Sequence, residues 1–541
     1  ANLACNTVRT VGGGDAWCGR VALGTINICG IAVASGEMVC MNSNEIRRTF
    51  IEFFAERGHV HMPSASLVPR NDPTVLLTTA GMQQMTPYFL GLERPPASRL
   101  TSIQKCFRTV DIDEVGDESH LTFFEMMGNF SVGDYFKGEA ISWAWELLTE
   151  VFRIPADRWY PTVHETDDFA YAYWRDVIGI PAERIERLGD ANWWGPVGET
   201  GPNGPDSEIY FDRGPEHGCG RPTCGPSCDC ERFLETWNLV FMEFFKQEDG
   251  PQRPLPRQNI DTGMGLERIA MILQGKNSVF ETDLYFPILQ EAANLAGVRY
   301  GESAAVDRSL RVIADHARAV TFLIGDGVFP GNEGRSYVLR RVLRRAVRHG
   351  RLIGLREPFL GRMADVVIEM FHQHYPELDA GRARIQAVIS HEEEHFGRTL
   401  ETGIGRFESL AAELLSEGRQ VVPGGEAFRL YDTYGFPLEL TEELAADHGL
   451  AVERDEFEAA MAERRERSRA DVAQFDDAAR ARAEIYATFS ETPTEFLGYE
   501  ALVATAAVVG VSGRAGGQEV AEAGEEVGLI LDRTPFYGES G

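Results

Sequence analysis

The chain has 541 residues, which at roughly 100–200 residues per domain predicts three or four domains. Hydrophobic residues make up 43% and charged residues 25%, and no uninterrupted apolar stretch is long enough to span a bilayer, which argues against a disordered chain and against a membrane protein. The formal net charge of -31 argues against a general polyanion binder, so any contact with nucleic acid must use a local basic patch.

The first forty residues look unlike the sequence that follows them. An apolar run at 21–34 follows Arg20, which suggests a signal peptide, but the segment before it is long and contains Asp15. The alternative is sequence translated upstream of a start at Met41. We favour that alternative and treat residues 1–40 as an extension foreign to the fold.

The first regular pattern after this extension is an amphipathic helix. Ile46, Phe50 and Phe53 fall on one helical face. Ser43 or Asn44 could cap its N-terminus, because short polar side chains accept hydrogen bonds from the first free N–H groups.

Three domains are expected beyond the extension. Short β-rich runs and Gly/Pro-rich loops extend to about residue 286, with helical stretches near 139–153 and 231–245. Helical periodicity then dominates, notably in 384–417 and 455–485, until Val- and Gly-rich runs return. We predict an α/β (α+β) domain with a mainly antiparallel sheet at 41–290, an all-α domain at 291–497, and the start of a β domain, truncated by the chain end, at 498–541.

Four cysteines cluster in a Gly- and Pro-rich loop with the spacing Cys-x4-Cys-x3-Cys-x-Cys: Cys219, Cys224, Cys228 and Cys230. Four thiolates could enclose one structural Zn²⁺ with no open coordination position. Free thiols and a redox pair remain alternatives, and His217 is a reserve ligand. Clustered thiols in a cysteine-poor chain indicate a reducing compartment, the cytoplasm.

Two segments carry residue types suited to binding a nucleotide. Arg108 ends a β-like run, and after an acidic loop a second run carries Phe124, so an arginine could bind a phosphate while an aromatic ring faces a purine. A surface arginine and a core phenylalanine would look the same. Further on, Asp261, Gly263 and Gly265 precede a helix, and the glycines would allow a ligand to approach the backbone.

A basic patch lies on one predicted helix. Five arginines at relative positions 0, 1, 4, 5 and 8 fall on one stripe: Arg340, Arg341, Arg344, Arg345 and Arg348. Their mutual repulsion requires either a polyanion or acidic neighbours facing them.

Taken in order, these segments resemble a known family. The strings SLVPRNDPTVLLTTAGM, TFFEMMGNFSVGDYFK, WNLVFMEF, DTGMGLER, GNEGRSYVLRRVLRRAVRHG and YDTYGFP look like alanyl-tRNA synthetases, which belong to the class II aminoacyl-tRNA synthetases. The resemblance extends from about Met41 to the last residue. It implies a class II catalytic domain, a helical tRNA-recognition domain and the opening strands of an editing domain.

The resemblance also implies roles for the nucleotide-binding residues. Arg108 would hold the α-phosphate of ATP, Phe124 would stack on adenine, and Arg268, which follows Gly265, would bind the γ-phosphate. Fixed guanidinium groups together with Mg²⁺ would stabilise the charge that builds on the phosphate oxygens.

The same resemblance implies an alanine pocket. Asp261 would pair with the substrate ammonium, Trp194 and Val240 would form pocket walls, and Asn238 is a weaker candidate. Trp193 is the alternative to Trp194, because the string NWWGPVGETGP is one residue longer than a common family form, and core packing would explain either ring. In the loop TGPNGPDSE, Asn203 and Asp206 stand where another form of the family carries cysteines.

For RNA, the resemblance implies that Asn332 and Asp432 read the wobble pair of the acceptor stem and that Arg335 joins the five arginines in binding tRNA. A loop-capping asparagine and a helix-capping aspartate are the plainer interpretations.

The predicted function is alanine–tRNA ligation with ATP, alanine and tRNA(Ala) as partners. A noncatalytic tRNA-binding paralogue and a tRNA-independent adenylating enzyme are the alternatives. Arg108, Asp261 and Arg268 argue against the first, and the arginine stripe argues against the second. Both a monomer and a homodimer stay open.

Overall fold

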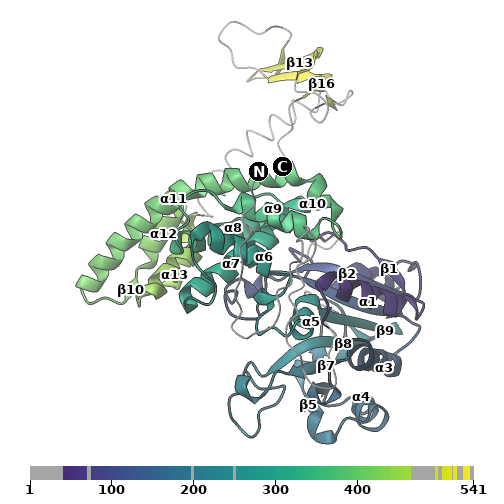
Figure 1. Cartoon of the computed structure of the whole chain (residues 1–541). Helices are drawn as coiled ribbons and strands as arrows, with labels where there is room; N and C mark the ends of the chain where they lie inside the picture. The colour runs from purple at the N-terminus through teal and green to yellow at the C-terminus, as the bar shows by residue number, and fades with distance from the viewer. Residues whose placement is uncertain are drawn as a thin grey trace, which may run out of the picture. The chain divides into compact units, whose positions relative to one another are not determined.

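A computed structural model gives the fold of the chain (Figure 1). It describes residues 40–69, 75–196, 200–247, 252–434, 436–464, 494–497, 503–513, 516–518, 520 and 528–535. The predicted extension therefore lies almost wholly outside the described residues, as do the second part of the helical run expected at 455–485 and the last residues of the chain.

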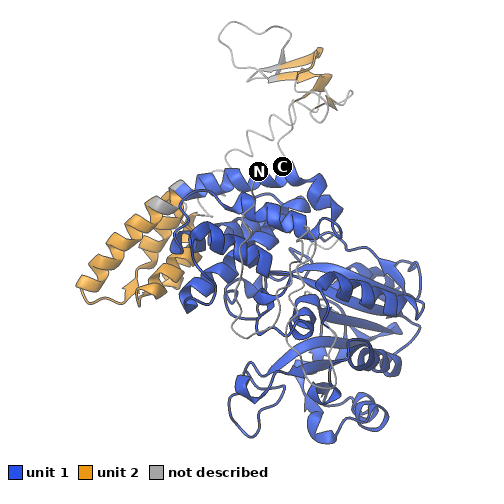
Figure 2. Ribbon diagram, viewed as in Figure 1, with its two compact units in different colours: residues 1–397 blue, residues 398–541 orange. Residues whose placement is uncertain are grey.

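The chain forms two compact units, residues 1–397 and 398–541 (Figure 2). The domain boundaries near residues 290 and 497 stay predictions from the sequence.

The first unit is built on a nine-stranded sheet with the order β1-β2-β3-β9-β8-β7-β4-β5, in which β6 pairs with β7. Only the outermost pairs, β1 with β2 and β4 with β5, are parallel, which confirms the expected mainly antiparallel sheet. The strands are β1 (Val60–Met62), β2 (Arg99–Phe107), β3 (Phe123–Val132), β4 (Trp159–His164), β5 (Glu186–Leu188), β6 (Trp193–Trp194), β7 (Gly201–Asp212), β8 (Phe233–Lys246) and β9 (Arg253–Gly265).

The helix expected near 231–245 is wrong, because this segment forms the central strand β8. Trp237 and Leu239 are buried on one face of the sheet, and Val240 and Met242 are buried on the other. A strand buried on both faces lacks the polar alternation of a surface strand, so its apolar run fits a helix equally well. The string TGPNGPDSE, expected as a loop, likewise forms the start of β7.

The predicted amphipathic helix is confirmed as α1 (Ser43–Ala55), which buries Ile46, Phe50 and Phe53. Its cap is Asn42, one residue before Ser43 and two before Asn44. Asn42 accepts from the Glu45 N–H at 2.9 Å, and the Glu45 carboxylate accepts from the Asn42 N–H at 2.9 Å. This reciprocal pair satisfies two N–H groups at once.

Shorter helices complete this part of the unit: α2 (Thr86–Phe89), α3 (Lys137–Glu146), α4 (Asp168–Ala172) and α5 (Leu266–Leu273). Helices α1 and α5 pack on each other; α1 also packs against β2 and β3, and α5 against β3, β8 and β9. The helix expected near 139–153 is confirmed as α3 with a π-helical turn at Leu147–Val151.

The helical part of the first unit comprises α6 (Phe286–Ala296), α7 (Ala304–Gly325), α8 (Gly334–Leu352), α9 (Leu360–Phe371) and α10 (Pro376–Ala380). Helix α7 joins it to the sheet, because the Phe322 ring stacks on the Phe123 ring of β3 at 4.3 Å between ring centres. Helix α8 packs along α7 (Figure 1).

Helix α11 (Arg382–Ser416) begins in the first unit and continues into the second, which confirms the helical run at 384–417. The second unit also contains α12 (Gly424–Tyr434), α13 (Leu438–Asp447) and the paired strands β10 (Val421–Val422) and β11 (Ala451–Val452). Near the chain end lie the short strands β12 (Glu495–Phe496), β13 (Val508–Gly513), β14 (Gly516–Gln518), β15 (Gly528–Leu531) and β16 (Arg533–Thr534), as the Val/Gly-rich text predicts.

Candidate active site

Three of the central strands bring Asp206, Val240 and Asp261 into one row. Asp206 of β7 pairs with Val240 of β8, which pairs with Asp261 of β9. Residues opposite each other in antiparallel strands point to the same face of the sheet. The two acids therefore flank a valine on one face, which we call the substrate face.

Asp261 is buried, with only 5% of its surface exposed. Burial raises the pKa of its carboxyl to about 7. Among the residues that the structure describes, none is hydrogen-bonded to this carboxylate, so a bound cation would supply its missing partner.

Asp206 is also buried, and burial raises its pKa to about 7. Its carboxylate accepts from the amides of Asn192 at 2.9 Å and Asn238 at 3.1 Å. Asn238 pairs with Gly263 in the next row of the same face. Asn238 is therefore oriented by the acid that neighbours Val240, which explains its place near the predicted pocket.

The two tryptophans that the sequence could not separate have different neighbours. Trp194 packs against the apolar cluster that contains Val240, Met82 and Met242. The Trp193 indole N–H instead donates to Asn203 at 3.2 Å. The Trp193 ring stacks with the Phe244 ring at 5.8 Å between ring centres. Trp194 is thus the one of the pair that shares a cluster with Val240.

The residues of the first segment that are predicted to bind the nucleotide, Arg108 and Phe124, also lie close together. Arg108 directly follows β2, and its guanidinium carbon lies 4.9 Å from the centre of the Phe124 ring on β3. Arg108 N–H donates to the Thr122 carbonyl at 2.9 Å, which fixes the backbone at the point where the arginine leaves the sheet.

Helix α5 begins directly after Gly265, the last residue of β9, and Arg268 lies in its first turn. Its guanidinium donates to the Glu235 carbonyl at 2.8 Å and to the Glu235 carboxylate at 3.0 Å. Both side chains are about one-third exposed, so a phosphate could compete for this arginine.

The two glycines of this segment differ in the space around them, and their expected role in ligand approach stays a prediction. A Cβ at Gly263 would lie 2.8 Å from the sulfur of Met126, so this glycine makes room for a neighbouring side chain. At Gly265 the nearest atom to such a Cβ is 3.7 Å away on Arg268, which is ordinary contact.

Sequence reasoning missed two carboxylates close to Arg268. Glu208 pairs with Asn238 across β7 and β8, and burial together with the charge of Glu235 raises its pKa to about 9. The Tyr210 hydroxyl donates to Glu208 at 2.6 Å. The signal was present in the alternation of Asp206, Glu208 and Tyr210 along one strand, which places all three on a single face.

The arginine stripe on α8 is only partly exposed. Arg345 and Arg348 are buried, each with 3% of its surface exposed. Glu392 lies between Arg340 and Arg344, at 3.3 and 2.8 Å. Acidic neighbours therefore do face part of the stripe, which is one of the two explanations that the sequence left open.

Of the remaining residues predicted to contact tRNA, Asn332 and Asp432 are exposed. Asn332 precedes α8 and accepts from the Arg340 guanidinium. Asp432 lies on α12 in the second unit and pairs with Arg464 at 2.7 Å. Arg335 is half-buried in the first turn of α8.

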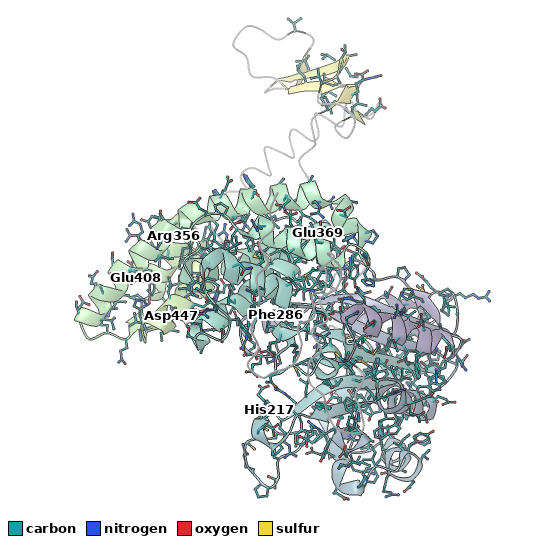
Figure 3. All side chains as sticks on the ribbon, viewed as in Figure 1. His217, Phe286, Arg356, Glu369, Glu408 and Asp447 are labelled. Atoms are coloured by element: carbon teal, nitrogen blue, oxygen red, sulfur yellow. The ribbon has the colours of Figure 1, made fainter. Side chains whose placement is uncertain are left out.

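The four loop cysteines come together between β7 and β8. Their sulfur atoms all lie within 4.8 Å of one another, with 3.5 Å between Cys219 and Cys228 and 3.4 Å between Cys224 and Cys230. Zinc–sulfur bonds of about 2.3 Å in a tetrahedron require sulfur atoms about 3.8 Å apart, so the four thiols fit this ion. His217, labelled in Figure 3, begins the loop and is outside this cluster of described residues.

Arg232 closes the base of the cysteine loop by donating twice to Asp212, at 2.7 Å each. Asp212 ends β7, and Arg232 immediately precedes β8. The loop is therefore anchored at its two ends, next to strands that carry the substrate face.

Comparison with known proteins gives one consistent result. The family model of class II (A) tRNA synthetases matches residues 45–541. The chain is 48% identical over 503 residues to alanine–tRNA ligase of Thermoanaerobacter sp. (strain X514), and 50% identical over 505 residues to that of Pelotomaculum thermopropionicum. Each match covers 93% of this chain and 57% of the relative, so the chain spans little more than half the length of these curated relatives.

Among solved structures, apo Staphylococcus aureus histidyl-tRNA synthetase is similar at 11% identity and a TM-score of 0.27, over 50% of this chain and 82% of that one. A likeness this weak adds nothing to the family match. None of the helices that the structure describes is both long and apolar enough to cross a membrane.

Proposed function

The chain belongs to the class II tRNA synthetases of the alanine type, and on that premise we propose that it activates alanine with ATP and transfers it to tRNA(Ala). The observation that carries the proposal is the substrate face: a buried acid, Asp261, beside a small apolar wall at Val240, on the sheet that also carries Arg108 and Phe124.

Alanine fits this face by charge and by size. Its ammonium group would pair with Asp261, whose carboxylate has no hydrogen-bond partner among the described residues. Its methyl group would contact Val240 and Trp194. The alanine carboxylate then attacks the α-phosphorus of ATP, a new P–O bond forms, the bond to the β-phosphate oxygen breaks, and pyrophosphate leaves.

The two arginines would bind the triphosphate at its ends. Arg108 beside Phe124 is suited to the α-phosphate and the adenine, and Arg268 is suited to the γ-phosphate at the N-terminus of α5. Charge stabilisation by fixed guanidinium groups requires no general base, because the attacking carboxylate is already ionised.

Mg²⁺ is the expected companion of ATP in this reaction and would neutralise part of the phosphate charge. Glu208 and Glu235 are the residues we assign to it, because their oxygens are the ligand type that Mg²⁺ prefers and they lie beside Arg268. A cation here would also offset the charge of Glu235, which together with burial raises the pKa of Glu208.

For tRNA we propose contacts from the arginines of α8 that are only partly buried and from residues outside this helix. The residues assigned are Asn332, Asp432, Arg335, Arg340, Arg341 and Arg344. Burial of Arg345 and Arg348 removes these two from the surface that RNA could reach.

We further propose a structural Zn²⁺ on the four loop cysteines, a catalytic domain at 41–290 and a tRNA-recognition domain at 291–497. The convergence of four thiols supports the ion and favours the reducing cytoplasm as the compartment.

Charging assays test the whole proposal. Purified protein with ATP, Mg²⁺, [¹⁴C]alanine and a tRNA(Ala) transcript should yield acid-precipitable alanyl-tRNA, and a transcript with a changed acceptor-stem wobble pair should yield far less. Equal charging of both transcripts would contradict the recognition part, and adenylate formation without any charging would favour a tRNA-independent enzyme.

A further inference from the structure

The segment from Arg108 to Thr122 connects β2 to β3 and rests on α7 and α8. Arg341 pairs with Asp113 at 2.7 Å, and Arg345 donates to the Val115 carbonyl at 3.1 Å. Helix α8 therefore holds the segment that begins with a proposed ATP-binding arginine, and α7 adds a contact through Arg311, which donates to the Gly116 carbonyl at 3.4 Å.

A chain of buried hydrogen bonds reaches the end of this segment. Arg345 on α8 lies 3.0 Å from Nε2 of His316 on α7, and Nδ1 of His316 lies 2.8 Å from the Asp315 carboxylate. The same carboxylate accepts from the Thr122 N–H at 3.0 Å and from the Thr122 hydroxyl. Asp315, His316 and Thr122 have no exposed surface, and Arg345 has 3%.

Asp315 and Arg345 together determine which ring nitrogen of His316 carries the proton. A guanidinium can only donate, so Nε2 must accept, and Nδ1 then carries the proton that it donates to Asp315. Each hydrogen bond in the series runs in a defined direction, and replacing the imidazole by an apolar ring would remove one buried hydrogen bond from Asp315 and one from Arg345.

Thr122 connects the series to the proposed reaction site. Its N–H and hydroxyl are held by Asp315, and its carbonyl accepts the Arg108 N–H at 2.9 Å. Among the residues that the structure describes, the Arg108 side chain makes a long contact with the Thr79 carbonyl, at 3.4 Å, and stacks on Phe124. The orientation of the Arg108 side chain therefore depends on the Arg108 backbone, which is hydrogen-bonded to Thr122.

We infer that Asp315 and His316, completed by Arg345, are positioning residues that orient Arg108 for adenylate formation, so that Arg345 serves the activation step and not RNA binding. The inference rests on the proposed function, because it takes Arg108 as a ligand of ATP. A series of hydrogen bonds would then connect α8 to the site of alanine activation.

Substitutions at His316 test the inference. His316→Phe removes both hydrogen bonds, whereas the amide of His316→Gln can still donate to Asp315 and accept from Arg345. The control is Arg362→Met on α9, where the side chain is 66% exposed. Circular dichroism first establishes that each variant unfolds cooperatively.

ATP–pyrophosphate exchange without tRNA gives the functional result. His316→Phe should lower kcat/KM for ATP at least tenfold and leave KM for alanine within twofold, while His316→Gln recovers most of the activity and Arg362→Met matches the wild type. The Kd for tRNA(Ala) should not change in any of them. Exchange at the wild-type rate in His316→Phe, or failure of His316→Gln to recover, would overturn the inference.

A second measurement does not depend on activity. Hydrogen–deuterium exchange in a peptide covering residues 108–122 should speed up at least tenfold in His316→Phe, with no change in a peptide covering α1. Unchanged exchange in 108–122 would refute the positioning role even if the enzyme were inactive for another reason. Absence of alanine-dependent activity in the wild type would instead refute the proposed function.

Discussion

Arg318 of α7 donates to the carboxylate of Glu267 over 2.6 Å, and neither side chain is exposed. The same guanidinium donates to Glu125 of β3 at 2.8 Å. Glu267 directly precedes Arg268, and Glu125 directly follows Phe124, so one arginine of the helical part joins the two segments that carry the proposed ATP ligands.

We predict that Arg318→Met destabilises the first unit by about 3–5 kcal/mol, because it leaves Glu267 buried without its cation and removes one of the two arginines that face the buried Glu125. Urea unfolding monitored by circular dichroism measures this. Arg362→Met, at an exposed ion pair, should change the free energy of unfolding by less than about 1 kcal/mol. Similar values for both variants would contradict the account.

The same network predicts acid sensitivity. Burial alone would raise the pKa of Glu125, but Arg47 and Arg318 lower it to about 2. A carboxyl with a folded-state pKa below its unfolded value contributes stability above the unfolded pKa and loses it as the pH falls through the folded one. This contribution should therefore be lost between about pH 4.5 and pH 2. Titration of the urea midpoint across that range, compared with Glu125→Gln, measures it.

The pKa of Asp261 predicts a pH dependence of alanine binding. Burial raises this pKa to about 7, and only the ionised carboxylate attracts an ammonium group. KM for alanine should therefore rise about tenfold per pH unit below 7 and level off above it. Steady-state exchange kinetics between pH 5.5 and 8.5 test this. A flat profile in the wild type would exclude Asp261 as the ammonium ligand.

Substitutions should separate the activation step from RNA recognition. Arg108→Ala and Arg268→Ala should lower ATP–pyrophosphate exchange at least a hundredfold, because each removes a proposed phosphate ligand. Asn332→Ala and Asp432→Ala should leave exchange within about twofold and lower tRNA charging. Exchange lost in the last two variants, with folding intact, would contradict this division.

Metal analysis tests the cysteine loop. Protein purified without added zinc should carry about one Zn²⁺ per chain, and Cys224→Ser should lose it and unfold at a lower temperature. His217→Ala should retain the ion, because His217 is outside the sulfur cluster. Substoichiometric zinc together with four freely titratable thiols would refute a structural site.

The sequence predicted the sheet class, α1 and the order of the motifs, because these follow from local periodicity and from the family strings. It did not predict β8 as a strand, since burial on both faces removes the alternation that distinguishes strand from helix. The separation of Trp194 from Trp193 depends on which cluster each ring reaches, and that contact is long-range.

The arginine stripe on α8 also shows what sequence spacing cannot predict, namely which side chains are buried. Spacing placed Arg345 on the face of Arg341, but Arg345 is buried against His316, while Arg341 is only partly buried and pairs with the exposed Asp113. Helical periodicity gives the direction of a side chain and not what packs over it. The depth of each arginine is set by α7 and by the segment 108–122, which are distant in sequence.

The most direct test of the account is alanine specificity at the substrate face. ATP–pyrophosphate exchange should be stimulated most by alanine, with serine and glycine as weaker substrates, because one methylene or hydroxyl changes binding by only about 1–3 kcal/mol. In Asp261→Asn the alanine-dependent rate should fall at least a hundredfold. Stronger stimulation by another amino acid, or full activity in Asp261→Asn, would contradict the assignment.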